Sequence, residues 1–246
     1  SKYLKKQKPK NVNLKIFEND YNVITKTRYI NFSGRKLFEI YERDGNLRKL
    51  YCKNFESKLK NSLRYYDIII LADFGHGLIN DRIIKIIQKY SKFLSINAQT
   101  NADNRGFNLI TKYKKADSIV IDQPEIRLAL SDKESNVSIM SDKLMNIINT
   151  RNLMITMGKD GIHLTTKLKK KKLKHNLNAF ELNPLDTMGA GDAVFGISSL
   201  LFKKKVDPKV IVFISNIFGS LATKIIGHEN YIKKIEVEKS IQYLLK

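Results

Sequence analysis

The chain has only one cysteine, Cys52, in 246 residues. A single thiol excludes an internal disulfide framework and any cysteine-rich zinc site, and it fits a reducing compartment. Long apolar runs are missing as well. The longest apolar stretch, residues 210–222, is interrupted by Ser215, Asn216 and Ser220, and it falls short of the ~20 residues that span a bilayer. We therefore expect no membrane partner and interpret residues 210–222 as a buried helix.

The first ten residues are basic but lack the apolar stretch of a signal peptide, so we expect a cytoplasmic protein. Acidic residues are scarce: 24 Asp and Glu stand against 45 Lys and Arg, which gives a net charge of +21. Such a charge often indicates nucleic acid as a partner. Because the excess is spread along a chain that is also rich in Asn and Ile, we disfavour that interpretation. The dense run at 167–174, KLKKKKLK, is interpreted as a solvated turn.

Hydrophobic residues make up 42% of the chain, which is enough for a full core at this length. Two strands are predicted at 23–30 and 36–41, so residues 1–52 are expected to form an N-terminal remnant and a small β lid. Residues 53–246 are expected to form an α/β core. Short apolar runs there are typical of strands buried on both faces: residues 67–73, 93–97, 118–122 and 153–157.

Helical patterns alternate with these strands, which predicts a mostly parallel sheet covered by helices. Asn80 or Asp81 is expected to cap one helix, and Pro124 to open another. A glycine-bounded turn at 158–161 predicts an antiparallel hairpin late in the sheet. The remaining predicted helices are 142–150, 189–202, 208–226 and 237–245.

Polar residues follow four of the predicted strands at the carboxyl end, where ligands bind in an open parallel sheet. The acids there suit a metal, and the glycines suit phosphates. In chain order these residues are Asp73 and Gly75, then Asn97 and Gln99, then Asp122 and Glu125, then Thr156, Gly158 and Gly161.

The stretch DTMGAGDAVF, residues 186–195, sets two glycines and two aspartates before an apolar helix. The amides of Gly189, Ala190 and Gly191 open that helix, so they lack intrahelical partners and, with the helix dipole, favour an anion. Asp192 would be repelled by such an anion. One reason to keep a carboxylate there is to accept a proton from an attacking nucleophile.

DTMGAGD resembles the second signature of the ribokinase-like (PfkB) carbohydrate kinases, D-T-x-G-A-G-D, at every fixed position. Weaker matches follow the family's order: ITKTR at 24–28, D-x-x-E at 122–125 and T-x-G-x-x-G at 156–161. Residues 24–28, 73–80 and 97–107 look most similar to the heptose-phosphate kinase branch. That branch includes kinase domains joined to nucleotidylyltransferases in surface-sugar synthesis. The resemblance covers about residues 20–246.

The resemblance implies a ribokinase-like three-layer sandwich with a small β lid, and ATP-dependent phosphorylation of a sugar or sugar phosphate. It implies that Asp192 is the general base and that residues 189–191 form the anion hole. Asp122 and Glu125 would order Mg²⁺ through water. The implied nucleotide-binding residues are Asp122, Glu125, Thr156, Gly158, Gly161, Thr187, Asn216 and Gly219. The substrate-side residues are Asp73, Gly75, Asn97 and Gln99.

The sequence departs from the family pattern in two places. Asp122 stands where many relatives have Asn, which adds negative charge near ATP and bears on metal preference. Residues 97–99 replace the Asp-Pro-Lys that is frequent in the heptose-kinase branch, which removes a cation. The family's first signature, a Gly-Gly segment beside the sugar, is expected ahead of residue 1. The chain is therefore expected to be an N-terminally truncated piece of a longer or bifunctional enzyme, with its own activity open.

Other interpretations stay open. Taken alone, Asp122 and Glu125 are also consistent with an ordinary solvent-exposed helix start, where acidic residues are favoured by the helix dipole. The same catalytic turn serves kinases of nucleosides or vitamin alcohols. A truncated relative could instead bind nucleotides or polyanions without catalysis, in which case binding would weaken steeply with salt. A homodimer through the β lid and a fused or partner nucleotidylyltransferase are the further partners that we expect.

Overall fold

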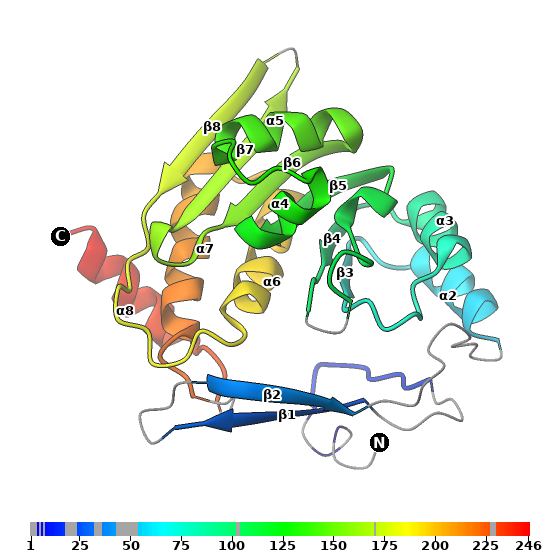
Figure 1. Cartoon of the computed structure of the whole chain (residues 1–246), viewed down its shortest axis with the longest axis horizontal. Helices are drawn as coiled ribbons and strands as arrows, with labels where there is room; N and C mark the ends of the chain where they lie inside the picture. The colour runs from blue at the N-terminus through cyan, green and yellow to red at the C-terminus, as the bar shows by residue number, and fades with distance from the viewer. Residues whose placement is uncertain are drawn as a thin grey trace.

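The computed structural model describes residues 4, 6, 8–17, 24–31, 36–42, 54–101, 104–169, 171–226 and 230–246. Cys52 and residue 23 of the first predicted strand lie outside them. The described residues form a two-stranded and a six-stranded sheet with helices (Figure 1). The first elements are β1 (Thr25–Ile30), β2 (Lys36–Glu42), α2 (Phe55–Leu63), β3 (Ile69–Asp73), α3 (Asp81–Tyr90), β4 (Leu94–Ala98), η2 (Ile110–Lys112), β5 (Lys115–Asp122) and α4 (Gln123–Leu130). They are followed by α5 (Val137–Ile147), β6 (Asn149–Thr156), η3 (Gly158–Asp160), β7 (Ile162–Leu168), β8 (Lys171–Leu177), α6 (Ala190–Lys203), α7 (Pro208–Ala222) and α8 (Lys234–Leu244).

The large sheet has the strand order β3-β4-β5-β6-β7-β8. Strands β3 to β6 pair in parallel, and β7 and β8 add two antiparallel pairings. The four apolar runs of the sequence are the four parallel strands, and the hairpin predicted after residue 157 joins β6 to β7. The prediction of an α/β fold with a mostly parallel sheet is confirmed.

Two apolar cores lie on opposite faces of this sheet. On β5, Ile119 and Ile121 pack into a core with α2 to α5, whereas Val120 between them packs into a core with α6 and α7. Successive side chains of a strand point to opposite faces, so a strand that is apolar throughout supplies both cores. Figure 1 shows the resulting three layers, with α4 and α5 on one face and α6 and α7 on the other.

Several helix boundaries differ from the predicted ones. The helix expected to contain residues 142–150 is α5, which begins after Asn136, whose side chain accepts the N–H of Ile139 (2.9 Å). It ends before residue 150 because the N–H of Asn149 donates to the carbonyl of Lys114 (3.0 Å) and Asn149 enters the sheet. Helix α7 ends at Ala222 rather than at 226, and α2 was not predicted.

The interpretation of the lysine run 167–174 as a solvated turn is wrong. Strand β7 continues to Leu168 and β8 starts at Lys171, so most of the run lies in the sheet. Strand β8 is the sheet edge, and its exposed positions alternate with half-buried ones. Lysines on an edge strand discourage pairing with another chain, which gives the run a structural reason.

The two-stranded sheet of β1 and β2 forms as predicted and stands apart from the large sheet in Figure 1. Its residues pair antiparallel, with Tyr29 opposite Phe38 and Thr27 opposite Ile40. Tyr29, Phe38 and Ile40 are all exposed. Within the described residues, no helix has both the length and the apolar character needed to cross a membrane.

Candidate active-site cleft

A cleft of about 530 Å³ lies at the carboxyl ends of β5 and β6, between the start of α4, the η3 turn and helices α6 and α7. It brings together residues that are up to 101 positions apart in the chain. The predicted site residues that line it are Asp122, Thr156, Gly158, Gly161, Thr187, Ala190, Gly191, Asn216 and Gly219.

Asp122 and Glu125 form a reciprocal cap at the start of α4. The carboxylate of Asp122 accepts the N–H of Glu125 (2.7 Å), and the carboxylate of Glu125 accepts the N–H of Asp122 (2.9 Å). Such a capping box satisfies two of the N–H groups that a helix start leaves open. D-x-x-E therefore does form a helix start, as the alternative interpretation of this motif expected. The same two hydrogen bonds fix the orientation of both carboxylates next to the cleft.

Glu125 is only 7% exposed. Burial, and then the charge of Asp122, raise its pKa to about 7, against the lowering effect of hydrogen bonds from the N–H groups of Asp122 and Thr100. The charge of Asp192 has a smaller effect in the same direction. Burial also raises the pKa of Asp122. Two acids whose ionisation is disfavoured thus lie at the start of α4, and Asp122 of this pair lines the cleft.

The η3 turn between β6 and β7 supplies two glycines with different surroundings. Gly158 has φ +58°, and a β-carbon built on it would meet nothing within 4 Å, so its backbone faces open space in the cleft. Gly161 has φ +86°, and a β-carbon there would lie 1.9 Å from the carbonyl oxygen of Leu177. Gly158 can therefore approach a ligand, whereas Gly161 is needed for the turn to pack on β8.

Helix α6 begins after Gly189, whose φ of +77° is the left-handed conformation that glycine adopts without strain. The loop before it is fixed, because the N–H groups of Leu185 and Asp186 both donate to the carbonyl of Thr223 at the end of α7 (3.0 and 3.1 Å). The N–H of Ala190 makes a long bond to Thr187 (3.4 Å).

Gly191 and Asp192 occupy the first turn of α6, where a helix offers no internal acceptor for the N–H groups. A β-carbon on Gly191 would meet nothing within 4 Å, so the backbone there is open to the cleft. Asp192 is exposed. Ala190 and Gly191 of the predicted anion site therefore line the cleft, whereas Gly189 and the predicted general base Asp192 are not among the described residues that line it.

The side chain of Asn216 on α7 forms hydrogen bonds that support the wall of the cleft. Its side-chain amide donates to the carbonyl of Asn178 (2.6 Å), and its oxygen accepts the N–H of Phe180 (3.3 Å). Gly219, one turn further, lies where a β-carbon would come 3.2 Å from Val194 of α6. Both residues keep α7 and the loop after β8 close to α6.

The four predicted substrate-side residues do not line the cleft in the described structure. The carboxylate of Asp73 is buried and accepts the hydroxyl of Tyr113 (2.7 Å) and the ammonium of Lys112. The side chain of Asn97 donates to the carbonyl of Val120 (2.9 Å). Gly75 and Gln99 lie beside Asp73 in a hydrogen-bonded loop. These residues form hydrogen bonds within the protein, and Gln99 precedes Thr100, whose N–H donates to Glu125 of the acid pair (2.9 Å).

The residues present fit a divalent cation that is held mainly through water. Within the described residues, no cluster of three or more His, Cys, Asp or Glu side chains could hold an ion. Each carboxylate oxygen of Glu125 accepts one backbone N–H, from Thr100 or from Asp122. Glu125 would therefore contact a cation through a water molecule rather than directly. Asp122 lines the cleft and uses one oxygen for its cap.

Two charged residues that line the cleft, Lys159 and Glu181, were not singled out from the sequence. Lys159 belongs to the η3 turn between the two glycines and is exposed. Its place inside T-x-G-x-x-G is the signal that could have found it. Glu181 pairs with Lys224 (3.2 Å), and it lies in a loop whose sequence carries no comparable pattern.

No family model matches the chain. Curated relatives named bifunctional protein HldE match it at low identity. The one from Haemophilus influenzae strain PittEE is 24% identical over 220 residues, which is 89% of this chain and 44% of the relative. The one from Campylobacter fetus is 26% identical over 182 residues, which is 70% of this chain and 36% of the relative. The chain thus spans less than half the length of these relatives.

Solved structures share the fold. Ribokinase from Thermotoga maritima superposes with a TM-score of 0.67 at 16% identity, covering 90% of this chain and 70% of that one. Phosphofructokinase-2 from Escherichia coli in complex with potassium superposes with a TM-score of 0.66 at 14% identity, covering 87% and 68%. The chain therefore has the ribokinase-like fold, and its sequence is related to that of the HldE proteins.

Proposed function

We propose that this chain, with its ribokinase-like fold and its relatedness to HldE, is a carbohydrate kinase that transfers a phosphoryl group from ATP to a sugar or sugar-phosphate hydroxyl. One observation supports the proposal. Asp122 at the start of α4 and Ala190 and Gly191 at the start of α6 line a single cleft, and their partners Glu125 and Asp192 lie in the same two helix starts. Phosphoryl transfer depends mainly on positioning and on stabilising charge, and this arrangement supplies both.

In the proposed reaction, the acceptor hydroxyl oxygen bonds to the γ-phosphorus of ATP while the bond from that phosphorus to the β–γ bridging oxygen breaks. The hydroxyl proton goes to the carboxylate of Asp192, and ADP leaves with the bond's electron pair. The amides at the start of α6 stabilise the transferring phosphoryl group, while Thr156 and Gly158 hold the other phosphates. Mg²⁺, ordered through water by Asp122 and Glu125, would neutralise the phosphate charge.

The acceptor follows from the resemblance to the heptose-phosphate kinase branch: we propose a heptose phosphate. The relatives named HldE are bifunctional and about twice as long as this chain or longer. A nucleotidylyltransferase, joined or separate, is accordingly the proposed partner activity. A nucleoside or a vitamin alcohol is the alternative acceptor, and turnover assays with each class of substrate would distinguish them.

Asp192→Asn tests the general base. The amide keeps the size of the side chain but cannot accept the proton, so we expect sugar-dependent ATP turnover to fall by about 10²- to 10⁴-fold while calorimetric ATP affinity stays within about threefold. Unchanged turnover would remove Asp192 from that role. Asp207→Asn is a matched control, because Asp207 caps α7 through a single bond to the N–H of Lys209 (2.8 Å) outside the cleft.

A homodimer through the lid is also proposed. An isolated two-stranded sheet is marginally stable in water, and β1 and β2 present Tyr29, Phe38 and Ile40 on one exposed face. Burial of this face against a second copy would stabilise both lids. Sedimentation should show a dimer that Phe38→Ser dissociates, and a wild-type chain that is monomeric at assay concentration would contradict the proposal.

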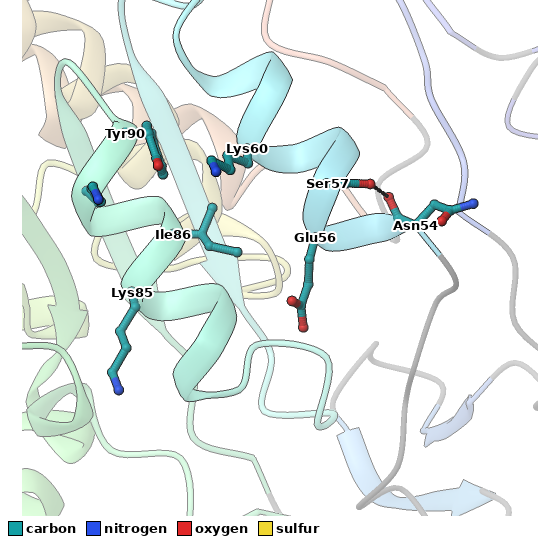
Figure 2. A pocket seen from close by; sticks show the side chains of 8 residues that line it. Asn54, Glu56, Ser57, Lys60, Lys85, Ile86 and Tyr90 are labelled. Atoms are coloured by element: carbon teal, nitrogen blue, oxygen red, sulfur yellow. Dashed lines mark hydrogen bonds between the residues drawn. The ribbon is translucent and has the colours of Figure 1, made fainter.

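One observation favours a second candidate function, polyanion binding without catalysis. A groove of about 580 Å³ between α2 and α3 is lined by Lys60, Lys85 and Lys89, and Glu56 is the one acid among the described residues that line it. Figure 2 shows Lys60 of α2 directed across the groove toward Tyr90 of α3, and the ammonium lies 5.5 Å from the ring centre. Basic groups beside an aromatic ring suit a phosphate backbone.

An oligonucleotide titration separates the two functions. If the groove is the functional site, affinity for a single-stranded DNA oligonucleotide should fall steeply between 50 and 200 mM salt and drop further in Lys60→Glu. If the cleft is the functional site, Lys60→Glu should leave turnover unchanged, and activity should respond mainly to Mg²⁺.

A further inference from the structure

The peptide bond between Gln99 and Thr100 lies directly beside the acid pair. Its N–H, which belongs to Thr100, donates to Oε1 of Glu125 (2.9 Å). Its carbonyl oxygen, which belongs to Gln99, accepts two hydrogen bonds on the opposite side. A trans peptide is planar, with its N–H and C=O pointing in opposite directions. Groups that hold the oxygen therefore also fix the direction in which the N–H points.

Two asparagine side chains hold that oxygen. The amide nitrogen of Asn104 donates to the carbonyls of Gln99 (3.2 Å) and Phe74 (2.9 Å). The amide nitrogen of Asn108 donates to the carbonyls of Gln99 (3.1 Å) and Asp73 (3.0 Å). Each side chain thus bridges the end of β3 to the residue that follows β4. Both are almost fully buried, at 5% and 3% exposure.

The loop is closed on its other side as well. Asn101 and Asn104 accept each other's backbone N–H groups through their side-chain oxygens (2.9 and 3.0 Å). Gly75 makes room for this arrangement, because a β-carbon there would lie 2.1 Å from the amide nitrogen of Asn104. The two side chains that hold the carbonyl of Gln99 are not among the described residues that line the cleft.

We propose that Asn104 and Asn108 are positioning residues, which act through the Gln99–Thr100 peptide to hold the carboxylate of Glu125 in its orientation at the cleft. With the second oxygen of Glu125 bound to the N–H of Asp122, the carboxylate is fixed at both ends. The consequence for binding rests on the proposed function: Mg²⁺ and nucleotide would then bind to an acid pair that is already oriented. Partners of this kind commonly change metal affinity by about 10- to 100-fold.

The test uses Asn108→Ala and Asn104→Asp, with Asn152→Ala as the matched control. Asn104→Asp keeps the oxygen that accepts from Asn101 but loses the amide donors. Asn152 is equally buried, at 6% exposure, and its side chain also donates to a backbone carbonyl, but that carbonyl belongs to Asp117 (3.1 Å) and not to Gln99. Two quantities are measured: amide hydrogen exchange at Thr100 and calorimetric affinity for ADP with Mg²⁺.

We expect both network variants to speed exchange at Thr100 at least tenfold and to weaken ADP–Mg²⁺ binding on the order of tenfold. Asn152→Ala should lower the melting temperature but leave both quantities near wild type. Variants that lower the melting temperature while Thr100 exchange and ADP–Mg²⁺ affinity stay at wild-type values would overturn the inference. A wild-type chain that binds no nucleotide would instead refute the proposed function, and the exchange measurement would still decide the positioning role.

Discussion

The Nδ1 atom of His163 on β7 lies 2.5 Å from Oδ1 of Asn176 on the neighbouring strand β8. The amide oxygen can only accept, so Nδ1 carries the proton. The other ring nitrogen then accepts from the hydroxyl of Thr165 (2.9 Å) or Ser141 (3.3 Å). A neutral imidazole satisfies this buried network, and burial lowers the pKa of His163.

This network predicts loss of stability at acid pH. The folded-state pKa of His163 is below its usual 6.5, so the unfolded chain binds a proton more readily than the folded one as the pH falls below about 6.5. The contribution of His163 is therefore complete above that pH and declines below it. Histidine NMR resonances should give a midpoint below 6.5 for His163, and a midpoint at or above that value would contradict the assignment.

Glu125 predicts a slope of the opposite sign. Its pKa rises from 4.5 to about 7 on folding, so the folded chain holds the proton more tightly. Its contribution is full below pH 4.5 and is lost as the pH rises to 7, by about 3 kcal/mol at most. Without Mg²⁺, urea unfolding of wild type relative to Glu125→Gln should show this decline. Parallel pH profiles for the two proteins would mean that Glu125 titrates normally.

The parts of the fold that were predicted correctly are those where local chemistry and tertiary packing agree. Residues 119–121 and 153–155 are all apolar because both sheet faces are covered, and Asn80 caps α3 through its own side chain. Strand β8 was missed because an edge strand buries little, so its lysines look like those of a turn.

The site was predictable to the extent that it lies in continuous motifs. DTMGAGD and T-x-G-x-x-G carry their own turn chemistry, and their residues do meet at the cleft. The assignment of Asp73 and Gln99 to the substrate side stays a prediction. Their hydrogen-bond partners in the structure, Tyr113, Asn104 and Asn108, lie later in the chain, and no local sequence pattern indicates which loop packs beyond a strand end.

The two glycines of the η3 turn predict different costs for the same substitution. Gly158→Ala introduces a left-handed alanine into open space, which costs about 1 kcal/mol. Gly161→Ala adds the same backbone strain and a clash with the carbonyl of Leu177 and the N–H of Ala179, so its cost should be several times larger. Urea denaturation of both variants checks this order. Equal costs would mean that β8 moves away freely from the turn.

Gly158→Ala carries a second expectation from the same geometry. Its methyl group would project into the cleft, so nucleotide affinity should fall more than the small change in stability implies. Calorimetry with ATP measures this directly. Full ATP affinity in Gly158→Ala would place the nucleotide phosphates away from the η3 turn.

Neighbouring residues on α7 give the sharpest comparison of buried polar groups. Asn216 and Ser215 are both buried, but Asn216 holds the loop after β8 through Asn178 and Phe180, whereas the hydroxyl of Ser215 has no hydrogen-bond partner in the described structure. Asn216→Ala removes two part-buried hydrogen bonds, to the exposed Asn178 and the half-buried Phe180, and should cost about 1–3 kcal/mol at about 0.5–1.5 kcal/mol each. Ser215→Ala removes an unsatisfied group and should be neutral or slightly stabilising.

If thermal unfolding shows equal losses for the two variants, the bonds of Asn216 do not hold the cleft wall. If only Asn216→Ala is destabilised and its ATP affinity also falls, the loop from β8 to α6 depends on that side chain for its place in the cleft.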